Sequence, residues 1–194
     1  MPTLYQMRAV LARARMWTFV LLAPYASEGQ TQLEQTLLTN EQERGMATNC
    51  TFCDGAHLRA QSPARVVYED DRFYVIHPLD EDAPAYLGTL MTVAKRHIPS
   101  FAELSAEEAQ ALGPLLARVT RALKVATGAE HAYTYFFGEG FRHLHVFTVA
   151  RYDAMPADYV RLDVERWPDA PRGDAAEVEA LCARIREALA RDAS

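Results

Sequence analysis

The stretch RHLHVFTVAR, residues 142–151, places two histidines two positions apart within a run of apolar residues. Alternate side chains of a β-strand share a face, so we expect His143, His145 and Phe147 to project together and the residues between them to enter the core. A single histidine here would fit a strand whose polar face merely meets solvent. Two imidazoles fixed side by side, behind the Gly-rich turn at residues 138–140, indicate a functional site.

Runs with strand character lie upstream of this stretch, separated by turn residues. The first two are joined by the acidic segment Glu69–Arg72, which is the pattern of a hairpin. In chain order the predicted strands are Arg65–Tyr68, Phe73–Ile76, Leu87–Ala94, Ala132–Phe137 and His143–Val149. The short turns between them favour antiparallel pairing.

Two helices accompany the strands. Ser105 stands three residues before Glu108 in a capping box, and apolar residues follow with helical spacing as far as about Gly128. A second helical pattern covers Ala175–Ala190, after a segment 151–174 that is rich in proline and charge. The predicted fold class is α+β, with an antiparallel sheet of about five strands, one long central helix and a C-terminal helix.

The length and charge of the chain limit its function. With 194 residues, of which 49% are apolar and 24% charged, it can form one ordinary domain with some excess. The formal net charge of -6 argues against a nucleic-acid-binding protein that depends on a basic surface, but it is compatible with a small anionic ligand. No apolar run approaches the roughly 20 residues of a membrane-spanning helix, so no membrane partner is expected.

The first 45 residues have an ambiguous pattern. Arginines at 8, 13 and 15 precede an apolar run at Met16–Ala23, which has the outline of a signal peptide. The apolar run is short, however, and the three cysteines of the chain form no disulfide framework. We interpret residues 1–45 either as a poorly structured N-terminal extension, or as a segment that is not native because the natural start is Met46. Residues 46–155 are the predicted main domain, and residues 156–194 a C-terminal tail and helix.

Cys50 and Cys53 are separated by two residues, so a tight turn can direct both sulfurs to one metal ion. Zinc suits a four-coordinate site of thiolates and imidazoles. Cys-x-x-Cys alone is also found in redox pairs, although such a pair normally begins a helix after a strand, and no such pattern surrounds Cys50. His97 and His143 are the strongest candidates among six histidines to complete a metal site.

Together these motifs resemble the histidine triad (HIT) superfamily. RHLHVFTVAR is similar to its signature, in which His-x-His-x-His is followed by apolar residues. VVYEDDRFYVIHPLDEDAP resembles the opening hairpin of the family, GTLMTVAKRHIPSFAEL its central strand and helix entry, and CTFC the zinc-binding pair of many members. The resemblance covers about Met46–Tyr152, which is the length of a whole domain.

The resemblance implies a nucleotide hydrolase or nucleotidyltransferase that cleaves at the α-phosphate of a dinucleoside polyphosphate, a nucleoside phosphoramidate or a nucleotide sugar. The middle histidine of the family motif, matched by His145, is the nucleophile and forms a nucleotidyl-histidine intermediate. The ligands of the zinc-binding members match Cys50, Cys53, His97 and His143. Four protein ligands make the expected zinc structural. A cytoplasmic homodimer is also implied.

Nucleotide contacts are expected, by the same resemblance, at Glu81, Glu139, Gly140 and Phe147. Asp80 and Asp82 compete with Glu81 for the ribose hydroxyls. Phe147 replaces the third histidine, which contacts phosphate and assists the leaving group, whereas the uridylyltransferase branch has Gln there. Glu139 stands where many members have Gln, and Gly140 where a hydroxyl often binds phosphate. Arg142 could compensate, although strand alternation points it away from His145.

These departures leave two alternatives open besides an enzyme. One is a catalytically impaired, zinc-containing nucleotide-binding module, and the other is a small zinc-stabilised interaction domain. The remaining candidates are interpreted as follows: Lys95 and Arg96 line the phosphate approach or are solvated, His57, His77 and His131 are surface or loop residues, Cys182 belongs to the core, and Trp167 packs over the domain or beside the nucleotide.

Overall fold

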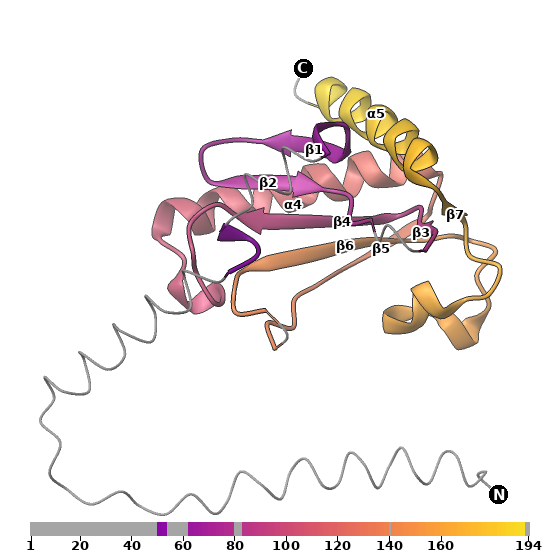
Figure 1. Ribbon diagram of the computed structural model, residues 1–194, viewed down its shortest axis with the longest axis horizontal. Helices are drawn as coiled ribbons and strands as arrows, with labels where there is room; N and C mark the ends of the chain where they lie inside the picture. Colours follow the sequence, from indigo (N-terminus) through magenta and orange to yellow (C-terminus); the bar gives the residue numbers. More distant parts are fainter. Residues whose placement is uncertain (1–49, 54–61, 80–82, 140, 193–194) are drawn as a thin grey trace, which may run out of the picture. The chain divides into compact units, whose positions relative to one another are not determined.

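Five strands form one antiparallel sheet in the order β1-β2-β4-β6-β5 (Figure 1). They are β1 (Val66–Glu69), β2 (Phe73–Ile76), β4 (Thr89–Ala94), β5 (His131–Tyr135) and β6 (His145–Arg151). The computed structural model describes residues 50–53, 62–79, 83–139 and 141–192. The predicted N-terminal extension, residues 1–45, lies outside the described residues.

Helices α4 (Ala106–Thr127) and α5 (Ala175–Arg191) share one hydrophobic core with the sheet. In Figure 1, α4 runs behind the strands and α5 lies beside β1. The capping box predicted at Ser105 begins α4, and Gly128, with a φ of 73°, ends it in the left-handed conformation that favours glycine. The strand residues that face the helices include Leu144 and Val146, as predicted. His143 and His145, which alternate with them, therefore face away from the helices.

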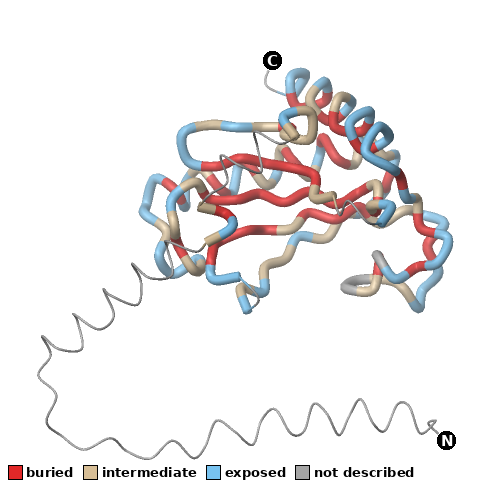
Figure 2. Tube along the Cα trace, viewed as in Figure 1, coloured by how far each residue is buried: buried red, intermediate tan, exposed pale blue. Residues whose placement is uncertain are grey.

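The opposite face of the sheet carries two smaller apolar clusters. Figure 2 shows the central strands buried along most of their length, so this face is also covered. Part of the cover is the segment between β6 and α5, which contains the 3₁₀ helices η4 (Ala157–Tyr159) and η5 (Arg161–Arg166). Trp167, 7% exposed, belongs to one of these clusters and packs over the sheet. Two further 3₁₀ turns are η2 (Pro63–Arg65) and η3 (Phe101–Glu103).

The structure confirms the predicted α+β class, the five-stranded antiparallel sheet and both helices. The sequence did not predict the 3₁₀ turns or the short pairing of β3 (Ala85–Tyr86) with β7 (Arg172–Gly173). The division of the chain at residue 155 stays a prediction, although α5 lies in the main core. Within the described ranges, no helix is long and apolar enough to cross a membrane.

Truncation of Ile185 tests whether α5 is an integral part of this core. Ile185 is fully buried against the sheet and α4, so Ile185→Ala should lower the free energy of unfolding by about 3 kcal/mol. Urea unfolding followed by circular dichroism measures the change. The control is Glu187→Ala, two residues further along the same helix and exposed, which should change stability little. Equal stability of both variants would contradict the packing of α5.

Candidate active site and metal centre

Four predicted metal ligands come together from three separate parts of the chain. The Sγ atom of Cys50 lies 3.3 Å from Nδ1 of His143, and Sγ of Cys53 lies 3.6 Å from the same nitrogen. Cys53 Sγ also lies 3.1 Å from Nδ1 of His97. All four ligand atoms are within 4.8 Å of one another, so the group could hold a metal ion.

The spacing of these atoms fits four-coordinate binding. Metal–sulfur and metal–nitrogen bonds of about 2.3 and 2.0 Å in a tetrahedron put neighbouring sulfur and nitrogen atoms about 3.5 Å apart. The sulfur–nitrogen distances of 3.1–3.6 Å bracket this value. A tight turn, in which the Cys53 N–H donates to the Cys50 carbonyl at 3.0 Å, directs both sulfurs to one side, as predicted.

His143 is completely buried, and its hydrogen bonds fix its tautomer. Its Nε2 lies 2.7 Å from the Ala94 carbonyl oxygen, which can only accept, so Nε2 carries the proton. The lone pair is therefore on Nδ1, which faces the two sulfurs. Burial lowers the pKa of His143, which favours the neutral form that a metal ligand requires.

His145 receives its orientation from the backbone of His143. Nδ1 of His145 lies 2.6 Å from the His143 carbonyl oxygen, so Nδ1 donates, and in the neutral ring Nε2 keeps the lone pair. His145 is 7% exposed at the start of β6. An imidazole with one nitrogen held as a donor and the other unprotonated can act as a nucleophile.

Four phenylalanine rings surround His145, and sequence reasoning identified only Phe147 among them. Phe52 stacks on the imidazole at 5.0 Å between centroids, with an angle of 24° between the planes. Phe147, Phe136 and Phe141 approach it edge-on at 5.5, 5.7 and 6.3 Å. The position of Phe52 between the two cysteines was the one available sequence signal for this cluster.

Of the four predicted nucleotide-binding residues, the structure describes two. Phe147 lies on the same face as His145, as predicted, and its ring stacks on Tyr135 at 5.6 Å. Glu139 is exposed in the turn that follows Gly138, whose φ of 71° requires glycine. Glu81 and Gly140 lie outside the described residues. The nucleotide contacts therefore stay predictions.

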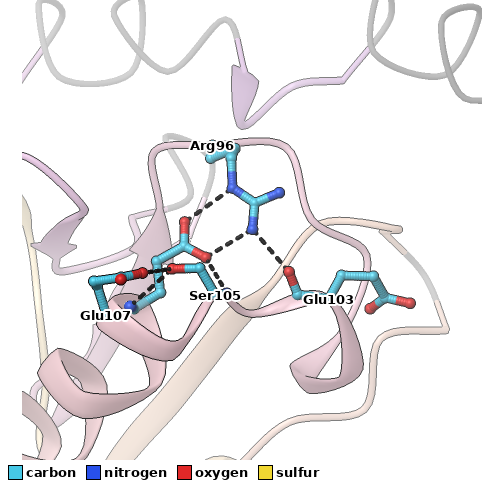
Figure 3. A network of polar contacts seen from close by, with 5 residues as sticks. Arg96, Glu103, Ser105 and Glu107 are labelled. Atoms are coloured by element: carbon cyan, nitrogen blue, oxygen red, sulfur yellow. Dashed lines mark hydrogen bonds and ion pairs between the residues drawn. The ribbon is translucent and has the colours of Figure 1, made fainter.

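The two cations at the end of β4 are paired with carboxylates. Lys95 Nζ lies 2.8 Å from Glu69 Oε1. Arg96 donates to both carboxylate oxygens of Glu108, at 2.9 and 2.7 Å, and to the Glu103 carbonyl at 2.7 Å (Figure 3). These bonds tie the residue next to His97 to the first turn of α4. Lys95 and Arg96 are thus paired within the protein, which neither predicted alternative, a phosphate approach or a solvated pair, described.

Among the other histidines and cysteines, His77 was predicted as a surface or loop residue, and the surface part of this prediction was wrong. His77 is completely buried, not at the surface, and its Nδ1 donates to the Pro78 carbonyl at 2.6 Å. Burial lowers the pKa of His77, so a neutral ring can occupy the end of β2. His131 is exposed, as predicted, and Cys182 is a core residue whose burial raises the pKa of its thiol to about 11. His57 lies outside the described residues.

Comparisons with known proteins identify a family and a shared fold. Residues 49–161 match the family model described as scavenger mRNA decapping enzyme C-term binding. A zinc-bound histidine triad family protein from Mycobacterium smegmatis has a similar structure, with 22% identity, a TM-score of 0.55, and coverage of 76% of this chain and 97% of that one.

Two further solved structures have the same fold. A hypothetical histidine triad nucleotide-binding protein from Sulfolobus tokodaii is similar at 22% identity and a TM-score of 0.53, over 73% of this chain and 93% of its own. A Hit-like protein from Bartonella henselae is similar at 18% identity and a TM-score of 0.52, over 72% and 96%. At these identities the structures share the fold.

The Arg96–Glu108 pair should make stability depend on pH. Its hydrogen bonds to Arg96 lower the pKa of Glu108 from 4.5 to about 2. The folded state therefore gains stability above pH 4.5, and this gain is lost as the pH falls towards 2. Glu108→Gln should lower the free energy of unfolding at pH 7 by about 1–2 kcal/mol, a value reduced because the Arg96 side chain is 52% exposed.

Urea unfolding at several pH values measures this effect. Glutamine can still accept the Ser105 N–H bond, so the capping box is retained. Glu187→Gln, an exposed substitution with the same charge change, is the control and should show no such pH dependence. The role of the ion pair would be contradicted if Glu108→Gln lowered the free energy of unfolding by the same amount at pH 3 and at pH 7.

Proposed function

We propose a function from one premise: the chain belongs to the histidine triad superfamily, within the family described as scavenger mRNA decapping enzyme C-term binding. On this premise the protein cleaves a substituted nucleotide at its α-phosphate. The substrate classes are dinucleoside polyphosphates, nucleoside phosphoramidates and nucleotide sugars, and the product is a nucleoside monophosphate or a transferred nucleotidyl group. Its relatives include a protein named as nucleotide-binding, which supports a nucleotide ligand.

The hydrogen bond from His145 Nδ1 to the His143 carbonyl is the observation that carries the proposal. In the neutral ring it places the lone pair on Nε2 of His145, as attack on phosphorus requires. In the proposed reaction an Nε2–phosphorus bond forms while the bond from phosphorus to the leaving group breaks, and the leaving group takes the bonding pair and a proton from solvent. Water then cleaves the Nε2–phosphorus bond, which restores neutral His145 and returns a proton.

The metal in the proposed site is zinc. Two thiolates and two imidazoles are the ligands that zinc prefers in structural sites, and the similar protein from Mycobacterium smegmatis is zinc-bound. Zinc held by Cys50, Cys53, His97 and His143 would supply no open position for water, so its contribution would be structural. It would join the Cys50–Cys53 turn to the residues that begin β6.

A second candidate function is a nucleotide-binding module without turnover. Phe147 favours it, because a phenyl ring at the position of the third histidine can neither donate to phosphate nor protonate a leaving group. In this case the fold, the metal and the nucleotide contacts would be retained.

The proposal has three further parts: the protein forms a homodimer, it is cytoplasmic, and Glu81 contacts the ribose.

Metal content tests the zinc assignment. Wild-type protein should contain about one zinc per chain, measured by atomic emission after dialysis, and Cys53→Ser should lower both the zinc content and the thermal midpoint. The control is Cys182→Ala, which removes the remaining cysteine. Cys182 is buried and does not belong to the ligand group, so this variant should keep the zinc. Retention of full zinc content by Cys53→Ser would remove Cys53 from the site.

Turnover tests the nucleophile. Release of nucleoside monophosphate should be measured from a panel of diadenosine polyphosphates, adenosine phosphoramidate and nucleotide sugars. His145→Ala should lower the rate by at least about 10³-fold while zinc content and folding are unchanged. The control is His131→Ala, an exposed histidine of β5, which should retain activity.

The results distinguish the two candidate functions. Turnover in wild type that disappears in His145→Ala supports the enzyme, whereas full turnover in His145→Ala would refute the assignment of the nucleophile. Nucleotide binding without any turnover in wild type would favour the binding module.

A further inference from the structure

Phe52 connects the candidate metal centre to the candidate nucleophile. It lies in the turn between Cys50 and Cys53 and is only 8% exposed, whereas its neighbour Thr51 is exposed. Its ring centroid lies 5.4 Å from that of His143 and 5.0 Å from that of His145. One side chain therefore contacts both a candidate metal ligand and the imidazole of the candidate nucleophile.

The hydrogen bond from His145 Nδ1 to the His143 carbonyl fixes only one atom of the imidazole. The torsion that turns a histidine ring has broad minima, because it joins an sp³ carbon to an sp² carbon. A good hydrogen bond also tolerates a deviation of about 30° from a straight line. The ring can therefore tilt about this bond, and tilting changes the direction in which Nε2 points.

Phe52 opposes such tilting because its ring lies along a face of the imidazole. The two planes differ by 24°, whereas the planes of Phe136, Phe141 and Phe147 differ from that of the imidazole by 79–88°. When two rings are nearly parallel, a tilt of one either pushes its edge into the other or opens a gap between them. Of the four neighbouring rings, Phe52 is thus the one that restrains the imidazole plane.

The ring of Phe52 is itself held in place. The Cys53 N–H donates to the Cys50 carbonyl at 3.0 Å, and this bond closes the turn that carries Phe52. The ring belongs to an apolar cluster on the histidine face of the sheet, together with Tyr74 and Met91. Ligation of both sulfurs would also fix the two ends of the turn. Phe52 is therefore held by its backbone and by its burial, as a restraint on another side chain requires.

We propose that Phe52 is a positioning residue for His145: its ring holds the plane of the imidazole, so that Nε2 keeps the direction needed for attack on phosphorus. This inference rests on the proposed function, because it concerns the same nucleophile. Phe52 acts through the imidazole and takes no part in bond formation. Loss of the restraint should slow the attack, since fewer bound complexes have the reactive geometry, and should leave substrate binding unchanged.

Two exchanges of Phe52 separate its flat face from its apolar bulk. Phe52→Leu keeps an apolar side chain but removes the face, and Phe52→Tyr keeps the face. Carbon-13 relaxation of the ring C–H groups of His145, in histidine-labelled and zinc-loaded protein, measures the motion of the imidazole. This motion should increase in Phe52→Leu and stay at the wild-type level in Phe52→Tyr. Both variants should contain about one zinc per chain, because neither changes a ligand.

Kinetics measured on the same proteins should show the consequence. Phe52→Leu should lower kcat about tenfold and change KM less than about twofold, which is the pattern of a lost positioning effect. Phe52→Tyr should retain kcat within about twofold of wild type. The matched control is Phe101→Leu, the same exchange at a half-exposed ring that contacts Phe136. It should change neither the ring motion of His145 nor kcat.

Four results would overturn the inference. They are wild-type motion of the imidazole in Phe52→Leu, equal kcat in Phe52→Leu and Phe52→Tyr, a raised KM with unchanged kcat, and loss of zinc from Phe52→Leu. The third would make Phe52 a substrate contact, and the fourth a structural part of the metal centre. Failure of the proposed function is distinguishable from all four. Absence of turnover in wild type, with increased imidazole motion in Phe52→Leu, would refute the enzyme but support the restraint of His145 by Phe52.

Discussion

His143 joins the candidate metal centre to the candidate nucleophile, and the arrangement of both depends on its hydrogen bonds. Its Nε2–H donates to the Ala94 carbonyl, which turns Nδ1 towards the sulfurs of Cys50 and Cys53. Its own carbonyl accepts from Nδ1 of His145. One residue therefore sets the tautomer of two imidazoles. A change in the position of this residue would alter metal ligation and the direction of the nucleophile together.

The antiparallel sheet holds His143 in this position. The Leu144 N–H donates to the Ile98 carbonyl at 2.6 Å, and the Ala94 N–H donates to the Leu144 carbonyl at 3.1 Å. These bonds tie the start of β6 to the end of β4 and to the segment that carries His97. Because α4 and α5 cover the other face, the part of the histidine face around His145 is left for the Cys50–Cys53 turn and the four phenylalanine rings.

Local patterns in the sequence predicted the parts of the structure that depend on residues close together along the chain. The two-residue period of RHLHVF predicted the common face of His145 and Phe147, and the Ser105 capping box predicted the start of α4. The burial of His77 could not be predicted, because it depends on which segments cover the end of β2. Phe52, Phe136 and Phe141 were missed as neighbours of His145, because their approach depends on how separate segments fold together. The proline-rich residues 151–174 have no regular spacing of apolar residues. The sequence therefore did not indicate their 3₁₀ turns.

The tautomers of His143 and His145 provide the most direct test of this coupling. Long-range ¹⁵N–¹H correlation spectra of histidine-labelled, zinc-loaded protein distinguish protonated, unprotonated and metal-bound ring nitrogens. His143 should have a proton on Nε2 and metal on Nδ1, and His145 should have a proton on Nδ1 with an unprotonated Nε2. A proton on Nε2 of His145, with Nδ1 unprotonated, would contradict the orientation of the nucleophile by the His143 carbonyl.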